Sequence, residues 1–147
     1  MITLKGRGVV AGVASGPALV TQKPMNFTAA LSSPILLLPG RHSEIRDRHH
    51  ELFKRSMQGT VMVFPACIGS TFTGMVLTQL LVQGYGPAAM VVQNADSLLV
   101  SGALLAEVWF GKGLPIIEYP GADLFAKIKD GNRVEVDGTS GEIKIYQ

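Results

Sequence analysis

The chain has 147 residues, a length typical of a single domain. Apolar residues make up 47%, charged residues only 16%, and the formal net charge is +2, so the composition allows a sizeable core and argues against nucleic-acid binding. The single cysteine, Cys67, excludes an internal disulfide framework and is typical of a reducing cytoplasm. No apolar run reaches the ~18 residues of a membrane span, and the N-terminus lacks the apolar segment of a signal peptide. We therefore expect a cytoplasmic protein with a large core or a buried partner interface.

In chain order, the sequence first predicts two strands over residues 2–20, separated by glycines. Residues 21 to about 57 show little periodicity and predict a long excursion with one or two short elements. From residue 59 the pattern alternates, and it predicts a strand over 60–64, a helix over 73–82, a strand over 87–93, a helix over 98–109, a strand over 114–117 and a short helix over 122–128. A hairpin over 132–137 and 142–146 closes the chain. Strands at both ends with helices between them predict a mixed α/β domain.

The loop between the 60–64 strand and the 73–82 helix is the first candidate site. Gly69 and Ser70 stand there, where the unpaired backbone N–H groups of a helix start can stabilise an anion. Ser70 is therefore a candidate general base or anion-binding group, and the alternative is that residues 70–73 simply cap the helix. Cys67 allows a redox, nucleophilic or metal role, but an inert loop residue is favoured because no cysteine or histidine adjoins it.

Two further segments carry polar side chains. In the stretch from Asp47 to Glu51, Arg48 is suited to a carboxylate or phosphate, whereas adjacent histidines of an extended segment point in opposite directions and rarely bind one ion. Substrate or partner contact and a solvated surface both stay open for this stretch. Before the 98–109 helix, Asp96 or Ser97 is expected as the N-cap, and ligand binding at this strand end is the less favoured alternative.

Several motifs occur together over most of the chain: Gly6-Arg7-Gly8-Val9-Val10-Ala11-Gly12, Asp47-Arg48-His49-His50, Val63-Phe64-Pro65, Gly69-Ser70, Pro87-Ala88-Ala89, Ala95-Asp96, and Ala106-Glu107 followed by Gly113-Leu114-Pro115-Ile116. In this combination the chain resembles the small, swivelling-domain subunit of the aconitase X family. The resemblance implies a swivelling β/β/α domain over residues 1–147. It also implies a hydro-lyase subunit that is inactive alone and that removes water from a small hydroxy acid together with a large subunit.

The resemblance also implies roles for particular residues. Ser70 corresponds to the family's catalytic proton acceptor, and Gly69, Thr71, Arg48 and His49 are the expected substrate contacts. The iron or iron–sulfur centre is expected on the large subunit, with no cofactor bound by this chain alone and Cys67 at most near the metal. A dehydration needs a base for the carbon proton and a Lewis acid for the departing hydroxyl. Ser70 would be the base, and the iron centre of the large subunit would be the Lewis acid.

The known activities of the family are dehydration of mevalonate 5-phosphate and of cis-3-hydroxy-L-proline. The family's archaeal pattern tends to have a basic residue before Gly-Ser, and here that residue is Ile68. The usual Asp-Pro-rich turn before residue 47 is also replaced, by Leu36-Leu37-Leu38-Pro39-Gly40-Arg41. Both departures favour cis-3-hydroxy-L-proline as the expected substrate, with mevalonate 5-phosphate as the alternative.

Two hypotheses of other classes stay open beside the dehydratase. Residues 129–138 resemble the phosphohistidine swivelling domain of phosphoenolpyruvate-utilising enzymes, which would make the chain a phosphoryl carrier. Such a carrier needs a histidine in the strand-to-helix loop, where Ser70 and Thr71 stand, so the likeness indicates a shared fold. A non-catalytic interaction module would fit the low charge content equally well.

Overall fold

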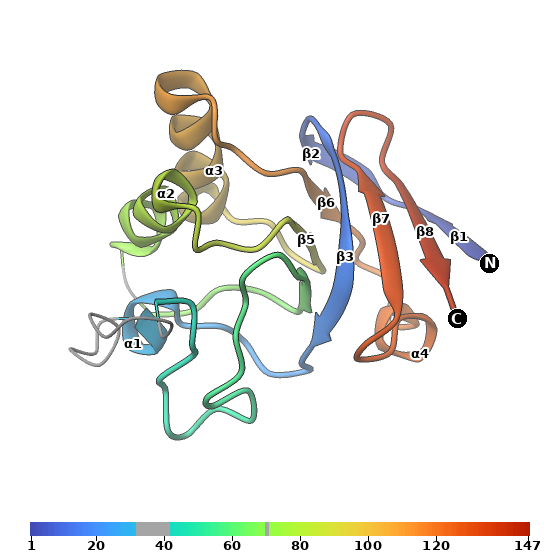
Figure 1. The fold of residues 1–147 in the computed structure, drawn as a ribbon. Coiled ribbons are helices and arrows are strands. Elements are labelled where there is room, and N and C mark those ends of the chain that lie inside the picture. Colours follow the sequence, from blue (N-terminus) through green and yellow to red (C-terminus); the bar gives the residue numbers. More distant parts are fainter. Residues whose placement is uncertain (32–41, 70) are drawn as a thin grey trace.

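A computed structural model describes residues 1–31, 42–69 and 71–147 (Figure 1). Within these residues the strands are β1 (Ile2–Lys5), β2 (Arg7–Val10), β3 (Val13–Val20), β4 (Val61–Phe64), β5 (Ala89–Val92), β6 (Ile116–Glu118), β7 (Arg133–Asp137) and β8 (Glu142–Tyr146). The helices are α1 (Phe27–Leu31), α2 (Thr73–Gln83), α3 (Ser97–Phe110) and α4 (Leu124–Lys127). None of the helices in the described ranges is long and apolar enough to cross a bilayer.

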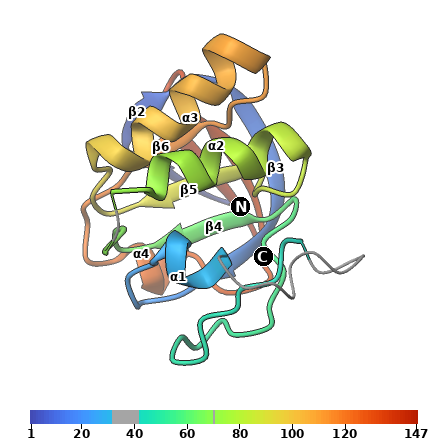
Figure 2. The same ribbon diagram turned by 90° about the vertical axis from the view of Figure 1, so that its left-hand side faces the viewer.

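The strands form one sheet in the order β1-β8-β7-β3-β4-β5-β6-β2. Strand β3 joins a parallel half of the sheet to an antiparallel half, because it pairs with β4 on one side and with β7 on the other. From β3 to β6 the neighbouring strands are parallel, whereas β1, β8, β7 and β3 pair in antiparallel fashion. Figures 1 and 2 show α2 and α3 covering the parallel half on the face away from β7 and β8. The result is a three-layer β/β/α arrangement, as the family resemblance implied.

The parallel strands are buried on both faces because a layer covers each side. Along β4 all four residues are buried, and alternate side chains enter different cores. Met62 and Phe64 pack in the core under the helices, and Val61 and Val63 pack in the core between the two halves of the sheet. This explains why the sequence of β4 is continuously apolar instead of alternating.

The helix ends agree with the sequence because glycines stop both long helices. Gly84 and Gly111 take the left-handed conformation at the C-caps of α2 and α3, with φ of +80° and +65°. The predicted strands and helices from residue 59 onward are confirmed, with bounds that differ by at most two residues. In the described part of the 21–57 excursion, the structure has the short helix α1 and an isolated bridge between Glu44 and Ser56.

The prediction of two strands over residues 2–20 is wrong, because three are present. The chain breaks at Gly6 and Gly12, and the strands on the two sides of Gly6 lie at opposite ends of the sheet order. A Cβ at Gly6 would lie 2.7 Å from the backbone oxygen of Glu118, so the crossing requires glycine. The glycines of this segment, Gly6 between Lys5 and Arg7 among them, gave no sign of this crossing.

Helices α2 and α3 approach each other closely through two glycines. A Cβ on Gly102 would lie 2.6 Å from the backbone oxygen of Gly74, so neither position has room for a side chain without a shift of the helices. The Thr78 hydroxyl is 2.8 Å from the Gly74 oxygen and 2.9 Å from the Gly102 oxygen, which ties the two helices together.

Candidate functional site

The parallel strands β3 to β6 all end at one edge of the sheet, so the loops that follow them gather there. The loop after β4 is held by the segment that follows β3. Met25 donates a backbone hydrogen bond to Ala66 (2.9 Å) and accepts one from Ile68 (2.9 Å), and it forms a parallel bridge with Cys67. The loop that precedes Ser70 is therefore fixed by backbone pairing up to residue 68.

A pocket of about 200 Å³ lies between this loop and the loop after β5. It is lined by Cys67, Ile68, Gly69, Thr73, Asn94, Asp96, Ser97 and Leu98. Thr73 and Ser97 are the first residues of α2 and α3, so both helices present their N-termini to the pocket. The positive ends of two helix dipoles at one pocket favour a negatively charged ligand or transition state.

Asp96 has a structural task in the pocket wall. Its Oδ1 accepts hydrogen bonds from the backbone N–H groups of Leu98 (2.9 Å) and Leu99 (3.0 Å), which makes Asp96 the N-cap of α3. The prediction of Asp96 or Ser97 as the cap is confirmed in favour of Asp96. Asp96 also lines the pocket. Its role as the cap of α3 therefore does not exclude the alternative, a contact with a ligand at this strand end.

Cys67 lines the pocket as a neutral thiol. Burial, and to a lesser extent the negative charge of Asp96, raise the pKa of Cys67 to about 12. Because the thiolate is the nucleophilic and metal-binding form, the side chain is unsuited to either role in this chain alone. This agrees with an inert loop residue, the interpretation that the sequence favoured.

Gly69 adopts a backbone conformation that other residues rarely take, with φ of +98°. The side chain of Asn26 lies directly over it, and a Cβ on Gly69 would come within 2.4 Å of Asn26 Nδ2. Sequence reasoning missed Asn26 because the two residues are far apart in the chain. The sequence signal for this edge of the sheet was the Gly69-Ser70 loop after the apolar strand β4, and it does not extend to Asn26.

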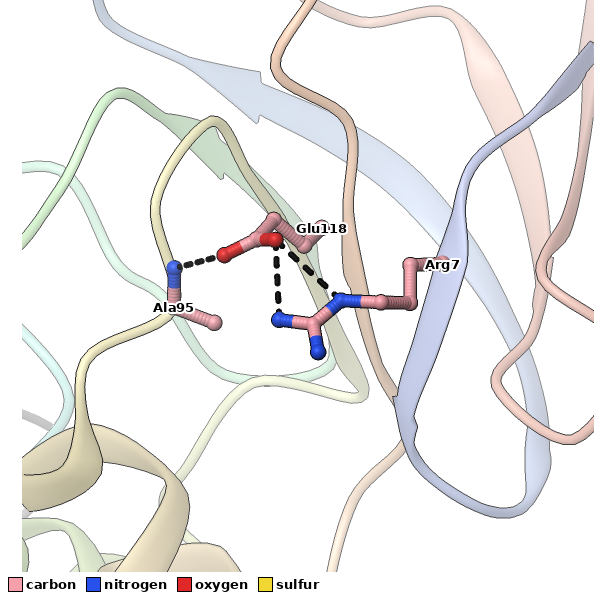
Figure 3. A network of polar contacts seen from close by, with 3 residues as sticks. All are labelled: Arg7, Ala95 and Glu118. Carbon is pink, nitrogen blue, oxygen red and sulfur yellow. Dashed lines mark hydrogen bonds and ion pairs between the residues drawn. The ribbon is translucent and has the colours of Figure 1, made fainter.

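Glu118, at the end of β6, is a second residue that the sequence did not reveal. One carboxylate oxygen accepts a hydrogen bond from the backbone N–H of Ala95 (2.8 Å), between the pocket residues Asn94 and Asp96. The other oxygen is held by Arg7 through Nε (3.2 Å) and Nη2 (2.9 Å), as Figure 3 shows. The Ala95 hydrogen bond, followed by the Arg7 contacts, lowers the pKa of Glu118. Glu118 therefore anchors the pocket wall as a carboxylate.

We predict that Glu118→Gln lowers stability at pH 7 by about 1 kcal/mol, since it removes the charge from the bonds to Ala95 and Arg7. The pKa of Glu118 in the folded chain lies below its ordinary 4.5, so its contribution is present above that value and is lost as the pH falls through the folded-state pKa. Urea denaturation at pH 7 and pH 3 measures this effect. Glu135→Gln, which removes only an exposed contact with Lys144, is the matched control. The prediction would be contradicted if Glu118→Gln changed the free energy of unfolding by the same amount at pH 7 and at pH 3.

The predicted site residues have different outcomes. Gly69 lines the pocket, Thr71 is exposed in the turn before α2, and Ser70 lies outside the described residues. Arg48 and His49 are exposed and are not among the residues that line the pocket. Of the described candidates, the structure thus brings only Gly69 and Cys67 together at the pocket, and the roles of all the candidates stay predictions.

The stretch from Asp47 to Glu51 is a compact turn that packs beside the end of β3. Asp47 Oδ1 accepts a hydrogen bond from the His49 backbone N–H (3.0 Å). His50 is buried, its Nδ1 accepts from the Leu52 N–H (3.1 Å), and its Nε2 lies 3.2 Å from the Pro24 oxygen. These partners require a neutral ring with the hydrogen on Nε2, so His50 has a structural role. The two histidines do not form a joint site.

The residues at the pocket do not fit a metal centre held by this chain. The described part of the chain contains no group of three or more His, Cys, Asp or Glu side chains that could hold an ion. At the pocket the two potential ligands are a protonated thiol and a carboxylate already used as a helix cap.

Comparison with known proteins gives a consistent result over almost the whole chain. The sequence model of the aconitase X swivel domain matches residues 3–145. The phosphomevalonate dehydratase small subunit of Methanocella arvoryzae is 33% identical over 142 residues, which cover 97% of this chain and 98% of that protein. The corresponding subunit of Pyrococcus furiosus is also 33% identical, with 97% and 94% covered.

Solved structures agree with the sequence relatives. The crystal structure of Thermococcus kodakaraensis aconitase X in its holo-form superposes with a TM-score of 0.83 at 28% identity and covers 100% of both chains. A solution NMR structure of a UPF0107 protein superposes with a TM-score of 0.82 at 25% identity, covering 99% of this chain. The family resemblance, the predicted fold class and the expected class of enzyme, a hydro-lyase subunit, are confirmed by these relatives. The chain belongs to the aconitase X swivel domain family.

Proposed function

We propose that this chain is the small subunit of a dehydratase that removes water from mevalonate 5-phosphate. The relatives named above support this substrate, because they match nearly full length and are phosphomevalonate dehydratase small subunits. They do not support the expectation of cis-3-hydroxy-L-proline. The observation that carries the proposal is a pocket at two helix N-termini with Gly69, the first residue of the Gly-Ser motif, on its wall.

Ser70 is the proposed base that accepts the carbon proton of the substrate. A serine is a poor base at its free pKa, so its alkoxide needs stabilisation by helix-terminal N–H groups or by cations. Ser70 stands directly after Gly69 of the pocket wall and three residues before Thr73, the first residue of α2. An iron or iron–sulfur centre on the large subunit would supply the Lewis acid for the departing hydroxyl.

Ile68 gave the main argument for an unphosphorylated substrate, and its surroundings support another role. Its side chain is 54% exposed and adjoins the pocket together with Leu98, which is 40% exposed. Phe72 and Met75, at the start of α2, are 57% and 68% exposed. We call Ile68, Phe72, Met75 and Leu98 the apolar rim. An exposed apolar residue in such a group suits contact with a partner protein. The apolar side chain of Ile68 is therefore not an argument against a phosphorylated substrate. The other departure, at residues 36–41, lies outside the described residues.

The apolar rim supports the proposal that a large subunit covers the pocket. Monomeric proteins rarely gather large exposed apolar side chains beside a ligand site unless another surface covers them. The pocket would then be one half of an active site that the partner completes. The phosphoryl-carrier hypothesis is not favoured, because Ser70 and Thr71 occupy the position at which a carrier needs histidine.

The proposed substrate is tested by assaying this chain, copurified with its large subunit, on mevalonate 5-phosphate and cis-3-hydroxy-L-proline. We expect kcat/KM for mevalonate 5-phosphate to be higher by at least roughly 100-fold, because a site that binds a phosphate leaves polar groups unpaired with a ligand that lacks it. Loss of water is followed by mass spectrometry. Unphosphorylated mevalonate is the matched control. Preferred turnover of hydroxyproline would overturn the proposed substrate, and turnover by the isolated chain would overturn the subunit role.

A further inference from the structure

Asn26 connects the first turn of α1 with the Gly69 turn of the pocket. Its Oδ1 accepts a hydrogen bond from the backbone N–H of Ala29 (3.1 Å), and its backbone oxygen accepts one from Ala30 (2.9 Å). Because Oδ1 is held by α1, the amide plane is fixed, and the amino group Nδ2 is the part left to face another neighbour. The helix cap therefore determines how this side chain is presented.

The neighbour that Asn26 faces is Gly69. A Cβ on Gly69 would lie 2.4 Å from Nδ2, 2.9 Å from Cγ and 3.2 Å from Oδ1 of Asn26. The amide thus occupies the space above the Gly69 Cα, where any other residue would place its side chain. Residue 69 must be glycine for this reason and also because its φ is +98°.

The backbone beside Asn26 holds the other end of the same loop. Met25 exchanges hydrogen bonds with Ala66 and Ile68, both at 2.9 Å. The segment formed by Met25 and Asn26 therefore contacts the loop through two backbone bonds and through one side chain packed on its turn. Among the described residues, the backbone bonds between this segment and the loop reach residue 68, and at Gly69 the contact comes from the Asn26 side chain.

We propose that Asn26 is a positioning residue of the dehydratase site. Its amide packs on Gly69 and holds the turn at the edge of the pocket, directly before the proposed base Ser70 in the sequence. Asn26 acts through Gly69 and does not itself move a proton. The proposal rests on the proposed function only where enzyme activity is the measured quantity.

The test distinguishes the capping of α1 by Asn26 Oδ1 from the contact of the Asn26 amino group with Gly69. Asn26→Ser and Asn26→Asp keep an oxygen that can cap α1 but remove the amino group, whereas Asn26→Ala removes both. In the enzyme assembled with its large subunit, we expect Asn26→Ser and Asn26→Asp to lower kcat roughly 10- to 100-fold with little change in KM or melting temperature. Asn132→Ala is the matched control, because Asn132 Oδ1 accepts a bond from Lys129 N–H (2.9 Å) in a turn before β7. Its kcat should be unchanged.

A second measurement does not depend on activity. Amide hydrogen exchange in the assembled protein should be faster at residues 66–69 in Asn26→Ser than in the unsubstituted protein. Gly69→Ala should also cost less in kcat when Asn26→Ala is already present, since the clash is then removed. Unchanged kcat together with unchanged exchange in Asn26→Ser would overturn the proposal. If the unsubstituted enzyme fails to dehydrate mevalonate 5-phosphate, the proposed function fails, and the exchange measurement still decides the role of Asn26.

Discussion

Ser70→Ala is expected to lower kcat for dehydration by roughly 10²- to 10⁴-fold, the range that a positioned general base contributes. Alanine removes the hydroxyl oxygen of the proposed base and should leave the Gly69 turn and the pairing of Met25 with the loop unchanged. Assembly with the large subunit should therefore be intact. Single-turnover kinetics on the assembled enzyme measure the loss, and size-exclusion chromatography measures the assembly.

A matched control for this substitution is available on α3. Ser101 is exposed and its hydroxyl donates to the Leu98 backbone oxygen at 2.9 Å, so Ser101→Ala removes a serine hydroxyl outside the pocket lining. We expect it to keep its turnover. If Ser70→Ala retained near-normal kcat, Ser70 would not be the base.

The second large effect is expected at the apolar rim. Met75→Glu should weaken association with the large subunit by roughly 10- to 100-fold, because an interface would have to bury an unpaired charge in place of an apolar side chain. Met75 is 68% exposed, so the isolated chain should fold as before. Isothermal titration of one subunit with the other measures the dissociation constant.

Val13→Glu is the control for the rim. Val13 is 65% exposed, similar to Met75, but it lies at the start of β3 in the antiparallel part of the sheet. Its association should match that of the unsubstituted chain. Activity of Met75→Glu should recover at high subunit concentrations, since the substitution leaves the pocket residues in place. Equal affinities of the Met75 and Val13 variants would mean that the partner binds elsewhere.

The strands and helices after residue 59 could be predicted because their signals are local. The continuous apolar run of β4 indicates a strand buried on both faces, and Gly84 and Gly111 mark helix ends by their left-handed conformation. The break at Gly6 could not be predicted, because it depends on the close approach of the Glu118 backbone from far along the chain. Local patterns contain no information about such approaches.

The same limit explains what sequence reasoning could and could not find at the site. Gly69 was predicted from its position between a strand and a helix. Asn26 and Glu118 act on the distant partners Gly69 and Ala95, so neither belongs to a motif with the residue that it holds. The sequence shows that Ile68 is apolar but not that it is exposed, because exposure depends on the fold. Its apolar character was therefore interpreted as evidence about the substrate.

The contact between Gly74 and Gly102 has a consequence for substrate size. Thr73 and Leu98 both line the pocket, and they belong to the two helices that meet at these glycines. The spacing between these two helices, which the Thr78 hydroxyl bridges, therefore contributes to the size of the pocket together with the loops. A family member with a larger residue at either glycine would hold the helices further apart and accept a bulkier hydroxy acid without any change among the residues that touch it.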